Sequence, residues 1–225
     1  MTASDSSAAP QELAPAGGRH AAGEDPLKRE QILDGAKRTF MGKGFDAASM
    51  NDVVRESGVS KGTIYVYFQN KEDLFAALIE RERGRFVNSM RSVLEEGKDL
   101  ETTLFRFGVT FCRHLTNDDV ICSMRSVLGV IDRMPNLAKR FFASEPVNVR
   151  IVLREYLEKQ AAAGVVAVED ADLAARQFIE LSSGTYFKFR LFGEIKEPPP
   201  QAEIEYVIAS AVRVFLCAYR PRQPG

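Results

Sequence analysis

Residues 44–78 read GFDAASMNDVVRESGVSKGTIYVYFQNKEDLFAAL, and two helices joined by a tight turn are predicted within this segment. Ser49 and Ser60 each precede a short apolar pattern at helical spacing, as residues that cap helix N-termini do. Between the two patterns, Gly58 permits the left-handed backbone of a tight turn, and Val59 fills the angle between the helices. The segment therefore predicts a helix-turn-helix whose second helix follows Ser60.

Helical periodicity continues on both sides of this segment. Asp25 and Pro26 are placed to begin a helix that ends near Gly44. Asn70 is placed to cap a long helix, with Asp73 completing a capping box. Three short helices and the start of a long one are thus expected by residue 73.

In the remainder of the chain, apolar residues also recur at helical spacing. We expect a brief helix around Leu137 and Phe141, a helix from Pro146 to Gly164, and a helix capped by Asp170. A last helix follows a run of three prolines. Because no comparable stretch alternates at period two, the fold is predicted to be all-α.

Composition excludes several classes of protein. The 225 residues include 45% hydrophobic side chains, but no run of about 18 apolar residues, so we expect no membrane span. The three cysteines and two histidines are too scattered for a disulfide framework or a metal site, and unpaired thiols fit a cytoplasmic protein. Catalytic motifs such as HExxH are missing, so we expect no enzyme, no catalytic residues and no cofactor. The net charge of −1 does not by itself point to nucleic acid.

The chain divides into three predicted parts. Residues 1–25 are mostly small, polar, proline or glycine, and we expect a disordered arm because they cannot bury enough apolar surface to offset chain entropy. Residues 26–72 hold the three short helices. Residues 73–225 form a larger helical domain.

The segment 44–78, with its SKGTIYVYF core and the following NKEDL, resembles the signature of the TetR family of transcriptional regulators. The resemblance implies an N-terminal three-helix helix-turn-helix domain, joined to a larger C-terminal helical domain for ligand binding and dimerisation. It also implies a repressor that binds a palindromic operator in double-stranded DNA and is released by a small hydrophobic effector.

Carried over position by position, the resemblance implies seven DNA-contacting residues: Ser49, Lys61, Gly62, Thr63, Tyr65, Tyr67 and Lys71. Ser49 and Lys71 are expected on phosphates. Lys61 is expected on a phosphate or a guanine, Gly62 where the backbone approaches DNA, and Thr63 on a base. The two tyrosines are expected to hold flanking phosphates, although the second could instead pack its ring inward.

The resemblance further implies a homodimer in which the last two helices pair with their copies across a two-fold axis. The final helix carries a wide apolar band that fits such pairing: Ile204, Val207, Ile208, Ala211, Val212, Phe215 and Leu216. Two recognition helices about 34–36 Å apart then meet adjacent major grooves. A monomer that buries this band internally is the alternative.

The C-terminal part is rich in aromatic residues and methionine, and a subset is expected to line an effector cavity. The predicted ligand contacts are Phe86, Met90, Phe107, Phe111, Met124, Arg125, Tyr156, Phe178 and Thr185. Arg125, Thr185 and also His114 are the candidate polar groups that orient the ligand. Such a stripe of aromatic residues is more often plain core than ligand lining.

Two other modes of control stay open. The same DNA-binding dimer could respond to a protein partner or organise the chromosome. Cys112 and Cys122 could form a thiol sensor, although a buried free cysteine commonly acts as a small hydrophobe.

Overall fold

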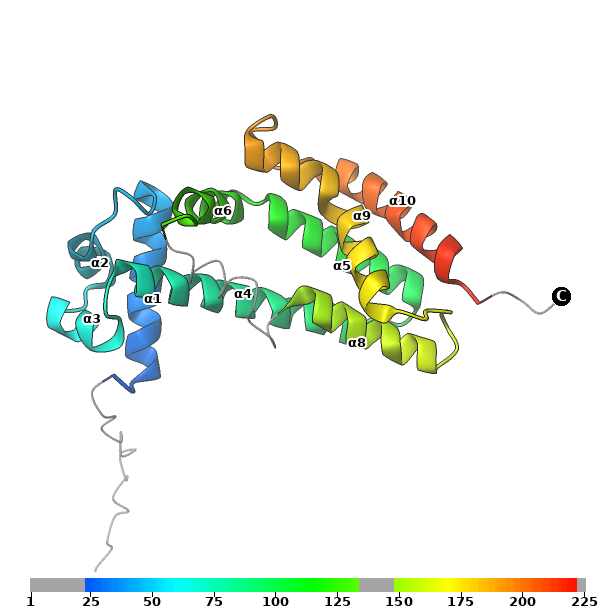
Figure 1. The fold of residues 1–225 in the computed structure, drawn as a ribbon, viewed down its shortest axis with the longest axis horizontal. Coiled ribbons are helices and arrows are strands. Elements are labelled where there is room, and N and C mark those ends of the chain that lie inside the picture. The colour runs from blue at the N-terminus through cyan, green and yellow to red at the C-terminus, as the bar shows by residue number, and fades with distance from the viewer. Residues whose placement is uncertain (1–22, 134–147, 222–225) are drawn as a thin grey trace, which may run out of the picture.

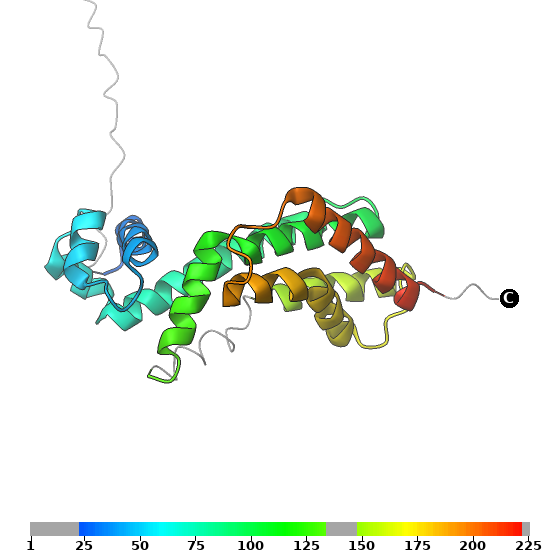
Figure 2. The ribbon, with the colours of Figure 1, turned by 90° about the horizontal axis from the view of Figure 1, so that it is seen from above.

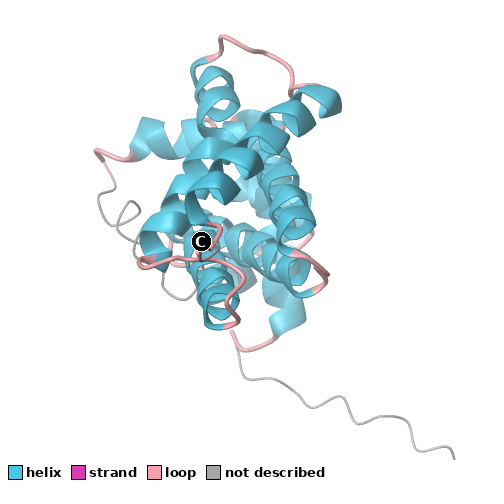
Figure 3. Ribbon diagram, turned by 90° about the vertical axis from the view of Figure 1, so that its right-hand side faces the viewer, coloured by secondary structure: helices cyan, strands magenta, loops and turns pink. Residues whose placement is uncertain are grey.

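The computed structural model describes residues 23–133 and 148–221, and within these ranges it contains helices and no strand (Figure 3). The helices are α1 (Pro26–Lys43), α2 (Met50–Ser57), α3 (Lys61–Tyr67), α4 (Lys71–Glu95), α5 (Leu100–Thr116), α6 (Asp118–Val130), α8 (Val149–Ala162), α9 (Ala171–Phe192) and α10 (Gln201–Tyr219). The predicted all-α fold is confirmed. Residues 1–22 of the predicted arm and the expected brief helix around Leu137 and Phe141 lie outside the described residues.

Helices α1, α2 and α3 lie together at one end of the molecule (Figure 1). The Asp25 carboxylate caps α1 by accepting from the N–H of Leu27 at 2.9 Å. Apolar side chains of α1, α2, α3 and the start of α4 form one core, in which the rings of Phe40 and Phe75 meet edge-on at 5.2 Å. This N-terminal core holds the three helices as one unit.

Helix α4 runs from the N-terminal unit into the rest of the molecule (Figure 2). Its first turns, up to Leu78, belong to the N-terminal core, whereas Val87 and the residues after it belong to a second core. The two cores therefore meet inside α4, between Leu78 and Val87. Asn70 caps α4 as expected by accepting from the N–H of Asp73 at 2.8 Å, and the Asp73 carboxylate accepts from the N–H of Gln69 at 3.2 Å.

The second core lies among α4, α5, α8, α9 and α10, with α5 against both α9 and α10. Its largest fully buried side chains include Phe107, Phe178 and Phe215. A Cβ on Gly108 would lie 2.7 Å from Cγ2 of Ile208, so α5 and α10 approach closely only because residue 108 is glycine. None of the described helices is long and apolar enough to cross a membrane.

Two sequence-based expectations about the C-terminal helices need correction. Helix α8 begins at Val149 and not at Pro146, because the side chain of Asn148 accepts from the N–H of Arg150 at 2.9 Å and caps the helix. Six of the seven apolar residues expected to pair α10 across a dimer are buried within their own chain. The six are Ile204, Ile208, Ala211, Val212, Phe215 and Leu216, so this band does not offer a free surface.

Candidate nucleic-acid interface and ligand cavity

The turn between α2 and α3 has the geometry that its residues predict. Gly58 ends α2 in the left-handed region, with φ 67° and ψ 14°. The side chain of Val59 is buried, and the hydroxyl of Ser60 caps α3 by accepting from the N–H of Thr63 at 3.2 Å. A residue that the sequence reasoning missed is Gly35, where a Cβ would lie 2.5 Å from Cβ of Ser57. Its lack of a side chain lets α1 and α2 cross closely.

Helix α3 has one buried side and one open side. Ile64 and Phe68 are buried, as expected. On the opposite side Lys61 and Gly62 are exposed, a Cβ on Gly62 meets nothing within 4 Å, and 46% of the Tyr65 surface is accessible. The N-terminal end and outer side of α3 therefore form an open surface.

Two further residues expected at this surface already make contacts within the chain. Thr63 is half-buried, and its hydroxyl is 2.8 Å from that of Ser60. Tyr67 is half-buried and packs against the N-terminal core, with its ring centroid 6.4 Å from that of Phe68. Tyr67 thus adopts the inward packing that the sequence left open.

Ser49 makes a reciprocal cap at the start of α2. Its hydroxyl donates to the Asp52 carboxylate at 2.7 Å and accepts from the Asp52 N–H at 3.2 Å. Lys43 at 2.6 Å and Arg55 at 2.9 Å also donate to this carboxylate. Hydrogen bonds from Lys43, Ser49 and Arg55 hold the pKa of Asp52 well below its usual range. The Ser49 hydroxyl proton is therefore committed to Asp52, a pairing that the Ser-x-x-Asp spacing could have revealed.

The side chain of Lys71 braces the loop between α1 and α2. Its ammonium donates to the carbonyls of Phe45 at 2.8 Å, Ala48 at 3.0 Å and Asp46 at 3.3 Å. It also lies 4.4 Å from the centroid of the Phe45 ring. An ammonium has three donors, and all three are used here, so we correct the expected phosphate contact to a structural role.

A cavity of about 1030 Å³ lies among α1, α4, α5, α6, α8 and α9. Apolar side chains from all six of these helices line it, including Met41, Ile79, Phe86, Phe111, Met124, Val149 and Ile179. Charged side chains, among them Lys37 and Glu82, complete the wall next to α1. The volume suits a small molecule of mainly apolar character.

The cavity brings together three of the nine predicted ligand contacts: Phe86, Phe111 and Met124. Three others, Met90, Phe107 and Phe178, are fully buried in the second core, and Tyr156 packs against it. Thr185 is exposed on α9. Arg125 donates to the carbonyls of Arg190 at 2.7 Å and Leu191 at 3.0 Å, which caps the end of α9. These six residues do not line the cavity.

His114 lines the cavity, and its imidazole is stacked on the Phe86 ring with 3.4 Å between centroids and 7° between planes. Burial lowers the pKa of His114 to about 4, so the ring is neutral near pH 7. On the same helix, burial raises the pKa of the Cys112 thiol to about 11. A thiol with such a pKa is poorly reactive, which disfavours Cys112 as a sensor.

Two family models match the chain. Residues 32–78 match the model for bacterial regulatory proteins of the tetR family, and residues 102–221, more than half of the chain, match the C-terminal domain of AefR-like transcriptional repressors. The chain belongs to the TetR family of transcriptional regulators. The sequence-based resemblance is thereby confirmed, and the helix-turn-helix is the DNA-binding element of this family.

Three known proteins illustrate what the chain is similar to. A regulator from Mesorhizobium loti is 23% identical and superposes with a TM-score of 0.80 over 87% of this chain and 98% of that one. The flavonoid-responsive regulator FrrA is 29% identical, with a TM-score of 0.68 over 88% of this chain and all of that one (100%). The fatty acid metabolism regulator protein of Bacillus subtilis is 29% identical over 89 residues, which is 40% of this chain and 44% of that protein. The chain spans less than half the length of the first curated relatives that it matches (26–44%).

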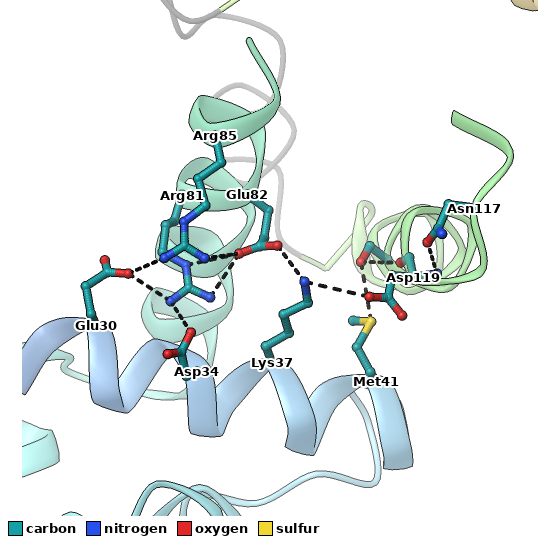
Figure 4. Close-up of polar contacts among 10 residues, drawn as sticks. Glu30, Asp34, Lys37, Met41, Arg81, Glu82, Arg85, Asn117 and Asp119 are labelled. Carbon is teal, nitrogen blue, oxygen red and sulfur yellow. Dashed lines mark hydrogen bonds and ion pairs between the residues drawn. The ribbon is translucent and has the colours of Figure 1, made fainter. Parts of the chain in front are cut away.

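In this TetR-family regulator, a cluster of ion pairs joins α1 to α4 and α6 (Figure 4). Arg81, with only 7% of its side chain exposed, binds Glu30 at 3.2 Å and Asp34 at 2.8 Å. Lys37 binds Glu82 at 2.7 Å. Burial alone would raise the pKa of the Glu82 carboxyl, but Lys37 and Arg81 outweigh this effect and hold the pKa below its usual value. The partners are about 45 to 51 residues apart in sequence, so no local pattern could have revealed them.

Proposed function

We propose that this protein is a repressor that binds a palindromic operator as a homodimer and is released when a small apolar ligand occupies the cavity. The observation that carries the proposal is the composition of the cavity wall. Lys37 and Met41 of α1 line it together with residues of α4, α5 and α6. A ligand in this cavity therefore touches the domain that carries α3.

For DNA contact, the proposal uses the open side of α3. Lys61 and Tyr65 are exposed there, and Gly62 leaves room for a phosphate or base to approach the backbone. Ser49 and Thr63 lie at the N-terminal ends of α2 and α3, where backbone N–H groups favour anions. Tyr67 contributes its hydroxyl at the rim. Lys71 is left out because its ammonium is already bonded.

For the dimer, the proposal uses the outer sides of α9 and α10. The large apolar residues exposed on these two helices include Leu181, Phe189, Tyr206 and Val214. Pairing these sides across a two-fold axis covers them and sets two copies of α3 on one face. A single short helix offers few base contacts, so two copies about 34–36 Å apart are needed for tight binding.

For the ligand, the apolar wall of the cavity and the names of two relatives agree. FrrA is named as flavonoid-responsive, and the Bacillus subtilis relative as a regulator of fatty acid metabolism. Flavonoids and acyl chains are both largely apolar. Release follows if the ligand favours a position of α1 that no longer fits two successive grooves, and the effect cannot exceed the ligand's preference between the two states.

Three measurements test this function together. Genomic footprinting of the purified protein locates the operator, and light scattering gives the number of chains bound to it. Anisotropy of labelled operator, titrated with flavonoids and fatty acids, then gives the effect of ligand. We expect a dimer on the palindrome and a ligand that weakens binding at least about tenfold. Operator binding that responds only to a protein partner would instead support control by protein contact.

A further inference from the structure

A smaller pocket of about 520 Å³ adjoins the cavity. Four residues line both: Phe86, Ser89, His114 and Asn117. The smaller pocket also reaches Arg113 of α5 and the two prolines, 198 and 199, that precede α10. It therefore lies on the side of α5 that faces the loop between α9 and α10, while the cavity lies on the side that faces α6 and α8.

The two spaces differ in charge. Among the described residues that line the smaller pocket, Arg113 is the one charged side chain, and there is no carboxylate. The cavity wall, by contrast, includes Glu82, Asp119 and Glu180. Arg113 is exposed and forms no ion pair with any residue in the ranges 23–133 and 148–221. Its guanidinium is thus available to an oxygen anion.

Neutral donors surround the same space. The Asn117 side-chain oxygen accepts from the N–H of Asp119 at 2.9 Å, which leaves its amide N–H groups to donate. Thr110 and Gln201 add a hydroxyl and an amide to the wall. A guanidinium and amide donors, with no competing carboxylate, are the groups that bind a carboxylate most strongly.

The stacked rings of Phe86 and His114 separate the two spaces. Each ring lines both, and the rings lie 3.4 Å apart between centroids. Within the described part of the chain, no hydrogen bond fixes the imidazole of His114. Rotation of these two side chains would therefore break only the ring stacking, which is a weak interaction, and no polar contact of the described residues.

We propose that the smaller pocket is the head-group subsite of the effector site. It takes the carboxylate of an amphipathic ligand, bound by Arg113, while the apolar part of the ligand passes the Phe86–His114 pair and fills the cavity. This inference rests on the proposed ligand control and adds the chemical class of the ligand: an apolar chain or ring system that ends in a carboxylate.

Calorimetric titration with decanoate and decanol tests the subsite, because the two probes share a chain and differ in the charged head group. We expect wild-type protein to bind decanoate at least about tenfold more tightly than decanol. Arg113→Gln should remove most of this preference and leave the decanol affinity within about twofold. The matched control is Arg106→Gln, an exposed arginine of α5 that pairs with Glu96 and does not line the pocket.

Each outcome decides something definite. Equal binding of the two probes, no binding of either, or equal losses in Arg113→Gln and Arg106→Gln overturns the subsite. The anisotropy of labelled operator, measured on the same samples, shows separately whether ligand binding changes operator affinity. If decanoate binds with the expected dependence on Arg113 but leaves operator affinity unchanged, the subsite stands and ligand release fails. If decanol and decanoate release the operator equally well, release stands and the subsite fails.

Discussion

The ammonium of Lys37 in α1 lies 2.7 Å from the carboxylate of Glu82 in α4. The same ammonium is 3.7 Å from Asp119 in α6, and all three side chains line the cavity. Helix α1 of the DNA-binding unit is therefore tied to both helices that lead into the C-terminal domain, at the cavity wall. Both side chains of the Lys37–Glu82 pair are about one-third exposed (37% and 31%), so the pair is weak enough for a ligand to displace.

Removing this pair should loosen α1 from α4. We expect Lys37→Met to lower the free energy of unfolding by about 0.5–1 kcal/mol, and a double-mutant cycle with Glu82→Gln to give a coupling of similar size. Urea unfolding measures both. Lys28→Met is the control, because among the described residues the Lys28 ammonium bonds only to Gln31 of its own helix, so this substitution should change stability little. A coupling energy near zero would contradict the link between the two helices.

The open side of α3 is expected to bind DNA without holding the fold together. Lys61→Ala and Tyr65→Ala should each weaken operator binding by about 1–3 kcal/mol, with the melting temperature nearly unchanged. Operator anisotropy and thermal unfolding are the two measurements. Ile64→Ala is the contrasting variant, since Ile64 is fully buried and its truncation should lower stability. Full operator affinity in both surface variants would mean that α3 does not contact the operator through Lys61 and Tyr65.

Lys71 is expected to stabilise the fold and not to neutralise a DNA phosphate. Lys71→Met removes three hydrogen bonds to carbonyls of the α1–α2 loop, so the free energy of unfolding should fall by about 1–3 kcal/mol. The slope of log affinity against log salt should stay the same, because that slope counts phosphates neutralised by the protein. A slope that is reduced by about one in Lys71→Met, with unchanged stability, would mean that Lys71 contacts a phosphate after all.

His114 should give the protein an acid-sensitive stability. Burial holds its folded pKa at about 4, below the ordinary value of 6.5. Between these two pH values the unfolded chain binds a proton that the folded chain does not, so the free energy of unfolding falls as pH is lowered through this window. Comparing urea unfolding at pH 7 and pH 4, wild type should lose roughly 1–3 kcal/mol more than His114→Gln. Equal losses would mean that His114 titrates normally.

Much of the fold could be predicted because its signals are local. The caps at Asp25, Ser49, Ser60 and Asp170 and the left-handed turn at Gly58 each depend on residues within a few positions of one another. Apolar periodicity then supplies the helix between two such signals. Even the start of α8 was missed by only a few residues, where the Asn148 cap and not Pro146 sets the helix start.

The cavity could not be predicted in the same way. Phe86 and Phe107 are the same residue type on helical stripes, yet one lines the cavity and the other is fully buried in the core. The difference depends on which helices lie opposite, and no local pattern encodes that. Buried Arg190 makes the same point, because it binds the carbonyl of Thr116 and the carboxylate of Asp118, more than 70 residues away.

Tight operator binding by a symmetric dimer depends most on two copies of α3 reaching neighbouring turns on one face of the DNA. Operator anisotropy with about five base pairs inserted between the half-sites tests this directly, since half a helical turn moves one half-site to the opposite face. We predict a loss of affinity of at least about a hundredfold, and partial recovery when the insertion is a full turn. Unchanged affinity for the half-turn insertion would contradict a symmetric dimer that reads both half-sites.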